Sequence, residues 1–208
     1  NTEMTTRDGT LLRCDIYRPE GGGKFPVLLC RTPYDKTTAR FAATASYLAS
    51  RGYIAVIQDQ RGRYASDGEY RWMFRDRSEN FDTDDGYDAC EWAAALPWSD
   101  GRVGLWGHSN ASWLVWHVIG SEPPSLKAGL ISGIFKDAID LNFGIFETGR
   151  RLEWTYMMAA DARRKAEDPT GPYSPEEATQ RWNDVERGKY IWWLPFASIP
   201  GEVFSTLD

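Results

Sequence analysis

Short apolar runs alternate along the first part of the chain with longer segments whose apolar residues recur at helical spacing. Buried strands are predicted for residues 25–30, 53–59, 103–106 and 126–134. Helices are predicted for residues 39–51, 81–96 and 110–119. Residues 11–17 alternate apolar and polar side chains, which is typical of an antiparallel edge strand with one solvent-facing side. Because strands and helices alternate at the spacing of βαβ units, residues 1–135 are expected to form a mostly parallel sheet with helices on both faces.

The pattern changes after residue 135. Residues 146–166 and 174–186 are predicted to form two amphipathic helices, and residues 191–200 are rich in aromatic residues and proline. We therefore interpret residues 136–208 as the start of a helical insertion over the carboxyl edge of the sheet, where α/β enzymes bind their substrates.

The candidate chemistry lies where the run 103–106 meets the helical segment that begins at Asn110. Gly107, His108 and Ser109 separate them, and a strand, a tight Gly-x-Ser turn and a helix form the context of a nucleophile elbow. Such a turn exposes the serine hydroxyl and directs the first N–H groups of the helix toward the space beside it. Ser109 is therefore the candidate nucleophile. The alternative is a turn with Ser109 as an ordinary helix cap, and Ala111 stands where the common form of the motif has its second glycine.

Composition and charge exclude several other classes of protein. With 42% hydrophobic and 14% aromatic residues, the 208-residue chain can bury a substantial core. No apolar run reaches the ~18 residues of a membrane span. A net charge of −6 without a basic cluster argues against nucleic acid or an anionic membrane as partner. Three cysteines lack metal-ligand spacing and are expected to be buried free thiols: Cys14, Cys30 and Cys90. No cofactor or metal ion is predicted.

Two loops are expected at the carboxyl edge of the sheet close to the elbow. One begins at Arg31 and contains Tyr34, and the other begins at Asp59 and contains Arg61. Either loop alone can be ordinary structure, with Asp59 and Arg61 forming a structural ion pair.

Together with the elbow, these loops resemble one known family. The motifs that carry this resemblance are Arg31-x-Pro-Tyr34-x-Lys36, Asp59-x-Arg61-Gly62-x-x-x-Ser66-x-Gly68, Pro97-Trp-Ser-Asp-Gly-x-Val103-Gly and Gly107-x-Ser109. In this order and spacing they are similar to the cocaine esterase / X-Pro dipeptidyl-peptidase family of α/β-hydrolases. Met4-x-x-Arg-Asp-Gly-x-x-Leu12 and Trp193-Leu-Pro also fit, so the resemblance covers nearly the whole chain. It implies the N-terminal part of an α/β-hydrolase core, followed by the start of a helical cap.

The resemblance also implies roles for individual residues. Ser109 would be the acylated nucleophile, and the Tyr34 hydroxyl would form the oxyanion hole with the backbone N–H of Asn110. Asp59 and Arg61 would be structural supports beneath the site. The family usually has an aromatic residue in place of Asn110 and glycine in place of Ser112. These departures affect the wall of the acyl pocket more than the chemistry.

A general base is missing from this sequence. A serine nucleophile needs a histidine that is oriented by a carboxylate. His108 directly precedes the nucleophile, so its side chain is expected to point away from Ser109. His117 is two helical turns further on, roughly 12 Å along the helix axis. Both histidines are expected to be packing residues.

In this fold the acid and the histidine follow the nucleophile in the chain, and they are expected beyond Asp208. The natural start is likewise expected to precede Asn1. The expected partners are a small ester or amide substrate and the remaining C-terminal part of the enzyme, on the same or a separate chain. Homo-oligomerisation and location are left open, with the cytoplasm favoured.

Three functions remain open on the sequence. The first is a serine hydrolase that cleaves an ester or amide through acyl-Ser109. The second is an acyltransferase or cyclase on the same scaffold, in which the cap excludes water. The third is a non-catalytic binding module that keeps the elbow without its base.

Overall fold

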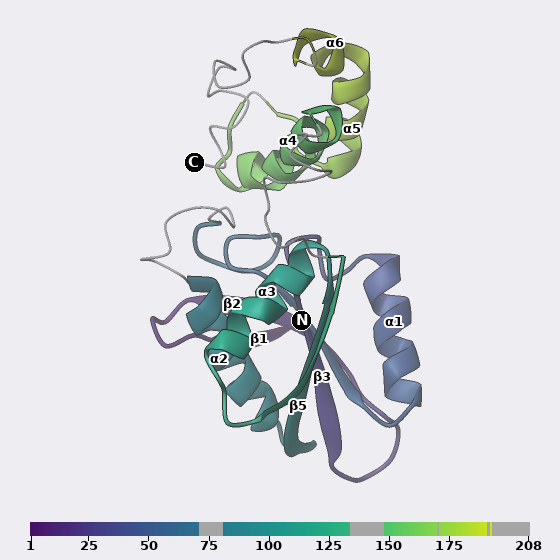
Figure 1. Cartoon of the computed structure of the whole chain (residues 1–208), viewed down its shortest axis with the longest axis vertical. Coiled ribbons are helices and arrows are strands. Elements are labelled where there is room, and N and C mark those ends of the chain that lie inside the picture. Colours follow the sequence, from purple (N-terminus) through teal and green to yellow (C-terminus); the bar gives the residue numbers. More distant parts are fainter. Residues whose placement is uncertain (71–80, 134–147, 170, 191, 193–208) are drawn as a thin grey trace. The chain divides into compact units, whose positions relative to one another are not determined.

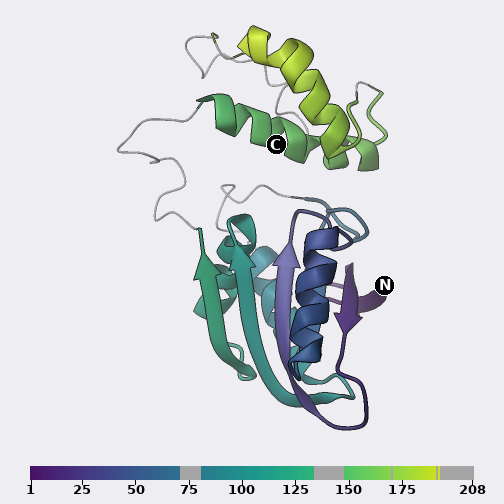
Figure 2. The same ribbon diagram turned by 90° about the vertical axis from the view of Figure 1, so that its right-hand side faces the viewer.

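The computed structural model describes residues 1–70, 81–133, 148–169, 171–190 and 192. Its strands form a six-stranded sheet in the order β1-β2-β4-β3-β5-β6. The strands are β1 (Thr2–Thr5), β2 (Leu11–Tyr17), β3 (Phe25–Thr32), β4 (Ile54–Asp59), β5 (Ser99–His108) and β6 (Leu126–Ser132). β2 is antiparallel to both β1 and β4, whereas β4, β3, β5 and β6 run parallel to one another. The carboxyl ends of the parallel strands therefore share one edge of the sheet (Figure 2).

The central strand β4 shows why the apolar runs form this sheet. All six of its residues are buried, and their side chains alternate between the two faces. Ile54 and Val56 pack in one core cluster with residues of α2 (Phe81–Ala94) and α3 (Asn110–Gly120). Ala55 and Ile57 pack in another cluster with Ala45 of α1 (Ala39–Ser50). A strand covered on both faces needs a continuous apolar run, and the predicted mostly parallel sheet is confirmed.

The three helices lie on opposite faces, with α1 on one side of the sheet and α2 and α3 on the other (Figures 1 and 2). α2 and α3 approach closely at Gly86, where an added Cβ would lie 2.1 Å from Cγ2 of Val118. The absence of a side chain at this position lets the two helices pack together over the strand that leads to Ser109.

The prediction that residues 11–17 form an edge strand is wrong. β2 lies between β1 and β4, and β1 pairs with it from Thr2↔Cys14 to Thr5↔Leu11. β1 is only four residues long, and Met4 is its one buried side chain. A single apolar position carries no periodicity, so this strand was not predicted.

The described residues fall into two compact units, one formed by residues 1–69 and 81–133 and the other by 70, 148–169, 171–190 and 192. The predicted domain boundary between residues 135 and 136 lies outside the described residues, as does most of segment 191–200. The division into a core and a cap therefore stays a prediction.

The described elements of the second unit are all helical. It contains α4 (Thr148–Lys165), α5 (Pro175–Arg181), the π-helical turn η2 (Trp182–Glu186) and α6 (Arg187–Tyr190). α5 begins with a capping box, in which the Ser174 hydroxyl accepts from the Glu177 N–H and the Glu177 carboxylate accepts from the Ser174 N–H. Trp182 and Tyr156 lie in the small apolar core between these helices.

Candidate functional site

The predicted strand, turn and helix around Ser109 are present. β5 ends at His108, α3 begins at Asn110, and Ser109 is exposed between them. The backbone of Ser109 has φ 58° and ψ −125°, a conformation that residues other than glycine rarely adopt. Such a conformation costs roughly 1–3 kcal/mol and persists only when the surrounding structure holds it.

Gly107 is required for this turn. A Cβ at this position would lie 2.4 Å from both the carbonyl carbon and the carbonyl oxygen of Ala111. The first turn of the helix thus lies directly against the end of the strand. Ala111 is 2% exposed, so alanine in place of the second glycine is compatible with the close approach.

The nucleophile candidate is also tied to the neighbouring strand. The Ser109 N–H donates to the carbonyl of Ser132 at the end of β6, over 2.9 Å. The Ser109 carbonyl accepts from the N–H groups of Ser112 and Trp113, at 2.9 and 3.3 Å. These bonds fix both peptide groups that flank the strained residue.

Asn110, the second predicted site residue, is the first residue of α3 and its side chain is 3% exposed. The backbone N–H groups at a helix N-terminus point outward from that end. The position of Asn110 is therefore suited to hydrogen-bond an oxyanion through its backbone, which stays a prediction.

Tyr34 lies on the loop that follows β3. β3 and β5 are adjacent parallel strands, so Tyr34 and Ser109 both follow strands at the same edge of the sheet. Tyr34 is half-buried, and its N–H donates to the Thr32 hydroxyl at 3.0 Å. The structure thus brings the two loops to neighbouring positions, while the role of the phenol stays a prediction.

The loop that carries Tyr34 is held by the loop after β4. One carboxylate oxygen of Asp59 accepts from the Lys36 N–H at 2.8 Å, and the other accepts from the Ala65 N–H at 3.3 Å. The Arg63 guanidinium donates to the carbonyl of Pro33 at 3.1 Å. Tyr34 is therefore flanked on both sides by backbone groups with buried side-chain partners.

Asp59 is a carboxylate in an unusual environment. Its side chain is buried, and the nearest cation, the Lys36 ammonium, is 3.9 Å away. Burial raises the pKa of Asp59 to about 6, although the hydrogen bonds from the Lys36 and Ala65 N–H groups act in the opposite direction. A carboxylate with a pKa near neutrality thus lies next to the loop of the predicted oxyanion hole.

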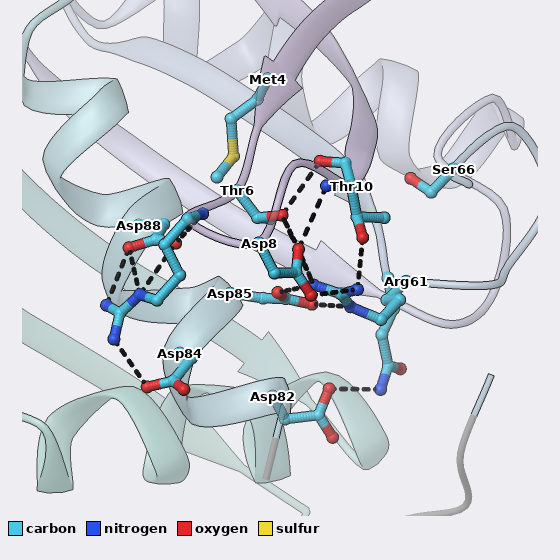
Figure 3. A network of polar contacts seen from close by, with 12 residues as sticks. Met4, Thr6, Asp8, Thr10, Arg61, Ser66, Asp82, Asp84, Asp85 and Asp88 are labelled. Atoms are coloured by element: carbon cyan, nitrogen blue, oxygen red, sulfur yellow. Dashed lines mark hydrogen bonds and ion pairs between the residues drawn. The ribbon is translucent and has the colours of Figure 1, made fainter. Parts of the chain in front are cut away.

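Arg61 is the centre of a polar network beneath this edge, drawn in Figure 3. Its guanidinium donates to both carboxylate oxygens of Asp85 on α2 and forms an ion pair with Asp8 in the turn between β1 and β2. It also donates to the Thr10 hydroxyl and stacks 4.6 Å from the Phe81 ring centroid. The guanidinium of Arg61 holds the pKa of Asp8 well below its usual range.

The suggested ion pair between Asp59 and Arg61 is wrong. Arg61 reaches Asp8 and Asp85 instead, whereas Asp59 faces Lys36 and two backbone N–H groups. The partners of Arg61 are separated from it by 53 and 24 residues, and no local pattern indicates them.

Arg31, near the carboxyl end of β3, also contacts the first turn of α2. It is buried, donates to the side-chain oxygen of Gln58 at 2.9 Å and donates to the carbonyl of Asp82 at 2.7 Å. Its guanidinium also lies 3.7 Å from Asp85. Arg31 and Arg61 together therefore bind the N-terminal turn of α2 to the loops near the elbow.

The two histidines differ. His117 is half-buried, with its ring edge-on to Trp113 at 5.4 Å and its Nδ1 3.4 Å from the Thr83 hydroxyl, as expected of a packing residue. His108 is exposed, so the prediction that it packs is wrong. Its Nδ1 lies 3.0 Å from the Ser132 hydroxyl, because its strand position directs the ring toward the end of β6.

Cys14, Cys30 and Cys90 are buried and free, as predicted. Burial raises the pKa of each thiol to about 12, so these cysteines are not activated nucleophiles. Within the described residues, no group of three or more His, Cys, Asp or Glu side chains is arranged to hold a metal ion. Nor is any helix in the described ranges long and apolar enough to cross a membrane.

Comparison with known proteins agrees with this arrangement. A model of the X-Pro dipeptidyl-peptidase (S15) family matches residues 8–192, which include both loops and the elbow. The chain belongs to the S15 family. This is a family of serine hydrolases that includes esterases and peptidases.

The similarity extends to individual members and to solved structures. The chain is 37% identical to the cocaine esterase of Rhodococcus sp. (strain MB1 Bresler) over 132 residues, which are 62% of this chain and 22% of that protein. An α-amino acid ester hydrolase superposes with a TM-score of 0.66 at 29% identity, covering 76% of this chain and 29% of that one. A CocE/NonD family hydrolase from Staphylococcus aureus superposes with a TM-score of 0.63 at 25% identity, covering 88% and 33%. The fold is thus that of an α/β-hydrolase, and the chain spans between a fifth and a third of the length of these relatives.

Proposed function

We propose that this chain is the N-terminal part of a serine hydrolase that cleaves an ester or amide bond through an acyl-Ser109 intermediate. The observation that carries the proposal is the geometry of Ser109. This residue is exposed in the turn between a strand and a helix, with φ 58° and ψ −125°, and Gly107 allows the close approach that the turn needs. Strained backbone conformations of this kind cluster at active sites, which supports a chemical role for Ser109.

In the proposed reaction, the Ser109 hydroxyl oxygen attacks the carbonyl carbon of the substrate while a general base takes its proton. The carbonyl oxygen becomes an anion, which accepts hydrogen bonds from the Tyr34 hydroxyl and the Asn110 N–H. Collapse of this intermediate expels the alcohol or amine, which leaves with the proton from the base. Water then attacks the acyl-serine by the same steps and releases the acid.

The general base is proposed to be a histidine beyond residue 208, oriented by a carboxylate that is also beyond it. The Nδ1 of His108 lies at the Ser132 hydroxyl, and His117 packs against Trp113 and Thr83. Neither contact includes Ser109. The greater length of the relatives leaves room for both residues, and the order nucleophile, acid, histidine is that of this fold.

The test uses the full-length natural protein that contains this sequence, with a p-nitrophenyl ester as probe substrate. Ser109→Ala is expected to lower kcat roughly 10⁴-fold or more, since the nucleophile itself is lost. Ser121→Ala, which removes a hydroxyl that donates to a helix carbonyl at the other end of α3, is the matched control. Full turnover by Ser109→Ala would refute the proposal, and transfer of most of the acyl group to an added alcohol or amine in place of water would indicate an acyltransferase.

A further inference from the structure

The hydroxyl of Ser112 forms an unusual set of hydrogen bonds at the elbow. Ser112 lies in the first turn of α3 and its side chain is completely buried. Its Oγ lies 2.6 Å from the carbonyl oxygen of Gly107 and 2.8 Å from that of Ser132, so its single proton is shared between them. It also accepts from the Ser132 N–H at 2.9 Å. One side chain thus joins the end of β5, the end of β6 and the start of α3.

This pattern differs from that of an ordinary serine within a helix. Such a serine bonds to the carbonyl three or four residues earlier, which belongs to its own helix. Ser112 instead reaches the carbonyl five residues earlier, on the strand before the elbow, and a second carbonyl 20 residues later. The contacts therefore connect three elements and do not stabilise the helix alone.

The Ser132 carbonyl links Ser112 to the candidate nucleophile. It accepts from the Ser109 N–H at 2.9 Å and from the Ser112 hydroxyl at 2.8 Å. Removing the hydroxyl would take one hydrogen bond from the Ser132 N–H and one from the Gly107 carbonyl, which would keep only the longer contact from the Ser132 hydroxyl at 3.2 Å among these side-chain donors. The strained backbone of Ser109 would then lose one of the constraints that hold it.

We propose that Ser112 is a positioning residue, whose hydroxyl holds the ends of β5 and β6 in the arrangement that keeps Ser109 in its reactive conformation. This inference rests on the proposed role of Ser109 as nucleophile. It assigns to Ser112 no contact with the substrate, so its loss affects the rate of attack more than substrate binding.

The test compares Ser112→Ala with the wild type in the full-length protein, using a p-nitrophenyl ester and a fluorophosphonate probe. We expect kcat and the labelling rate constant of Ser109 to fall by the same factor, about 10- to 100-fold, because small misplacements of a reacting group have effects of this size. KM should stay within about twofold, and labelling should still reach one probe per chain. Ser112→Cys keeps a weak donor of similar shape, so its kcat and labelling rate should lie between those of the wild type and Ser112→Ala.

Ser99→Ala is the matched control. Ser99 is buried at the opposite end of β5, and its hydroxyl accepts from the Gly101 N–H at 3.0 Å. Its loss should lower Tm while leaving kcat and the labelling rate unchanged. Equal kinetics for wild type and Ser112→Ala, or equal kinetic losses in Ser112→Ala and Ser99→Ala, would overturn the inference. Failure of Ser109 to be labelled in the wild type would instead refute the proposed function.

Discussion

The two edges of the parallel sheet are built from different kinds of contact. At the amino end of β5, Gly101 has φ 88° and Asp100 forms an ion pair with Arg102, whose side chain is 64% exposed. At the carboxyl edge, the charged groups of Asp59 and Arg61 are buried and hold loops through backbone and carboxylate partners. Both edges connect strands to neighbouring elements. The charged groups named at the carboxyl edge are buried, whereas the ion pair at the amino end of β5 is exposed to solvent.

This difference shows that the chain buries charged groups at the carboxyl edge, where their desolvation is unfavourable. Removing a charge from water is unfavourable unless its partners are well placed, and an exposed ion pair contributes little. Buried groups after β4 bind the loop that carries Tyr34, at the same edge of the sheet as Ser109. We infer that they keep those loops in one conformation, which a site for acyl transfer requires.

The largest effect on stability is expected at Arg61. Arg61→Gln leaves Asp85, which is 1% exposed, without its bidentate partner, and should lower the free energy of unfolding by about 3–5 kcal/mol. Arg102→Gln removes the exposed pair at the other edge and should cause no measurable change. Denaturant unfolding of both variants in the full-length protein checks this. Equal stability of the two variants would remove the distinction between the edges.

The next effect concerns catalysis. Tyr34→Phe removes one hydrogen-bond donor and little volume, and should lower kcat on the order of 10²–10³-fold, equivalent to about 3 kcal/mol. KM should change far less, since the charge develops only during the reaction. Tyr47→Phe, on the exposed surface of α1, is the control. Unchanged turnover in Tyr34→Phe would mean that the phenol only packs against its neighbours.

The smallest effect is a pH dependence of stability that originates at Asp59. Its pKa is about 6 in the folded protein and about 4 when unfolded, so the folded state binds the proton more tightly. The stabilisation by this proton is fully present below pH 4 and is lost as the pH rises through 6. The facing charges are the Lys36 ammonium and, further out, Asp15 and Asp35.

Asp59→Asn does not titrate, so it isolates this contribution. The unfolding free energy of the wild type minus that of Asp59→Asn should fall by roughly 2–3 kcal/mol between pH 4 and 7. The carboxylate hydrogen bonds lost in Asp59→Asn shift this free-energy difference by the same amount at every pH, so they do not alter its change with pH. A difference that stays flat with pH would show that Asp59 titrates normally.

The sequence was sufficient to predict those features that depend on local pattern. The continuous apolar run at residues 54–57 indicated a strand buried on both faces, and Gly107 with Ser109 indicated the tight turn between strand and helix. β1 was missed because it has one buried residue, and β2 was wrongly assigned to the edge as a consequence. A short strand is recognised by its pairing partner, and pairing is not visible in local periodicity.

The polar contacts of the site could not be predicted for the same reason. The partners of Arg61 come from a turn 53 residues earlier and a helix 24 residues later. Ser112 lies between Ala111 and Trp113 in a helix of apolar character, and nothing nearby indicates that its hydroxyl reaches two strand ends. The residue types thus indicated the candidate site, whereas the side chains that position its loops were identified only from the folded structure.

The most direct test of the central claim is the site at which a fluorophosphonate probe reacts with the full-length protein. Peptide mapping by mass spectrometry after complete labelling identifies the modified serine. We predict one probe per chain, on Ser109, with loss of ester turnover in proportion to labelling. A probe attached to Ser66 or Ser112, or full turnover by protein whose Ser109 is completely labelled, would contradict this prediction.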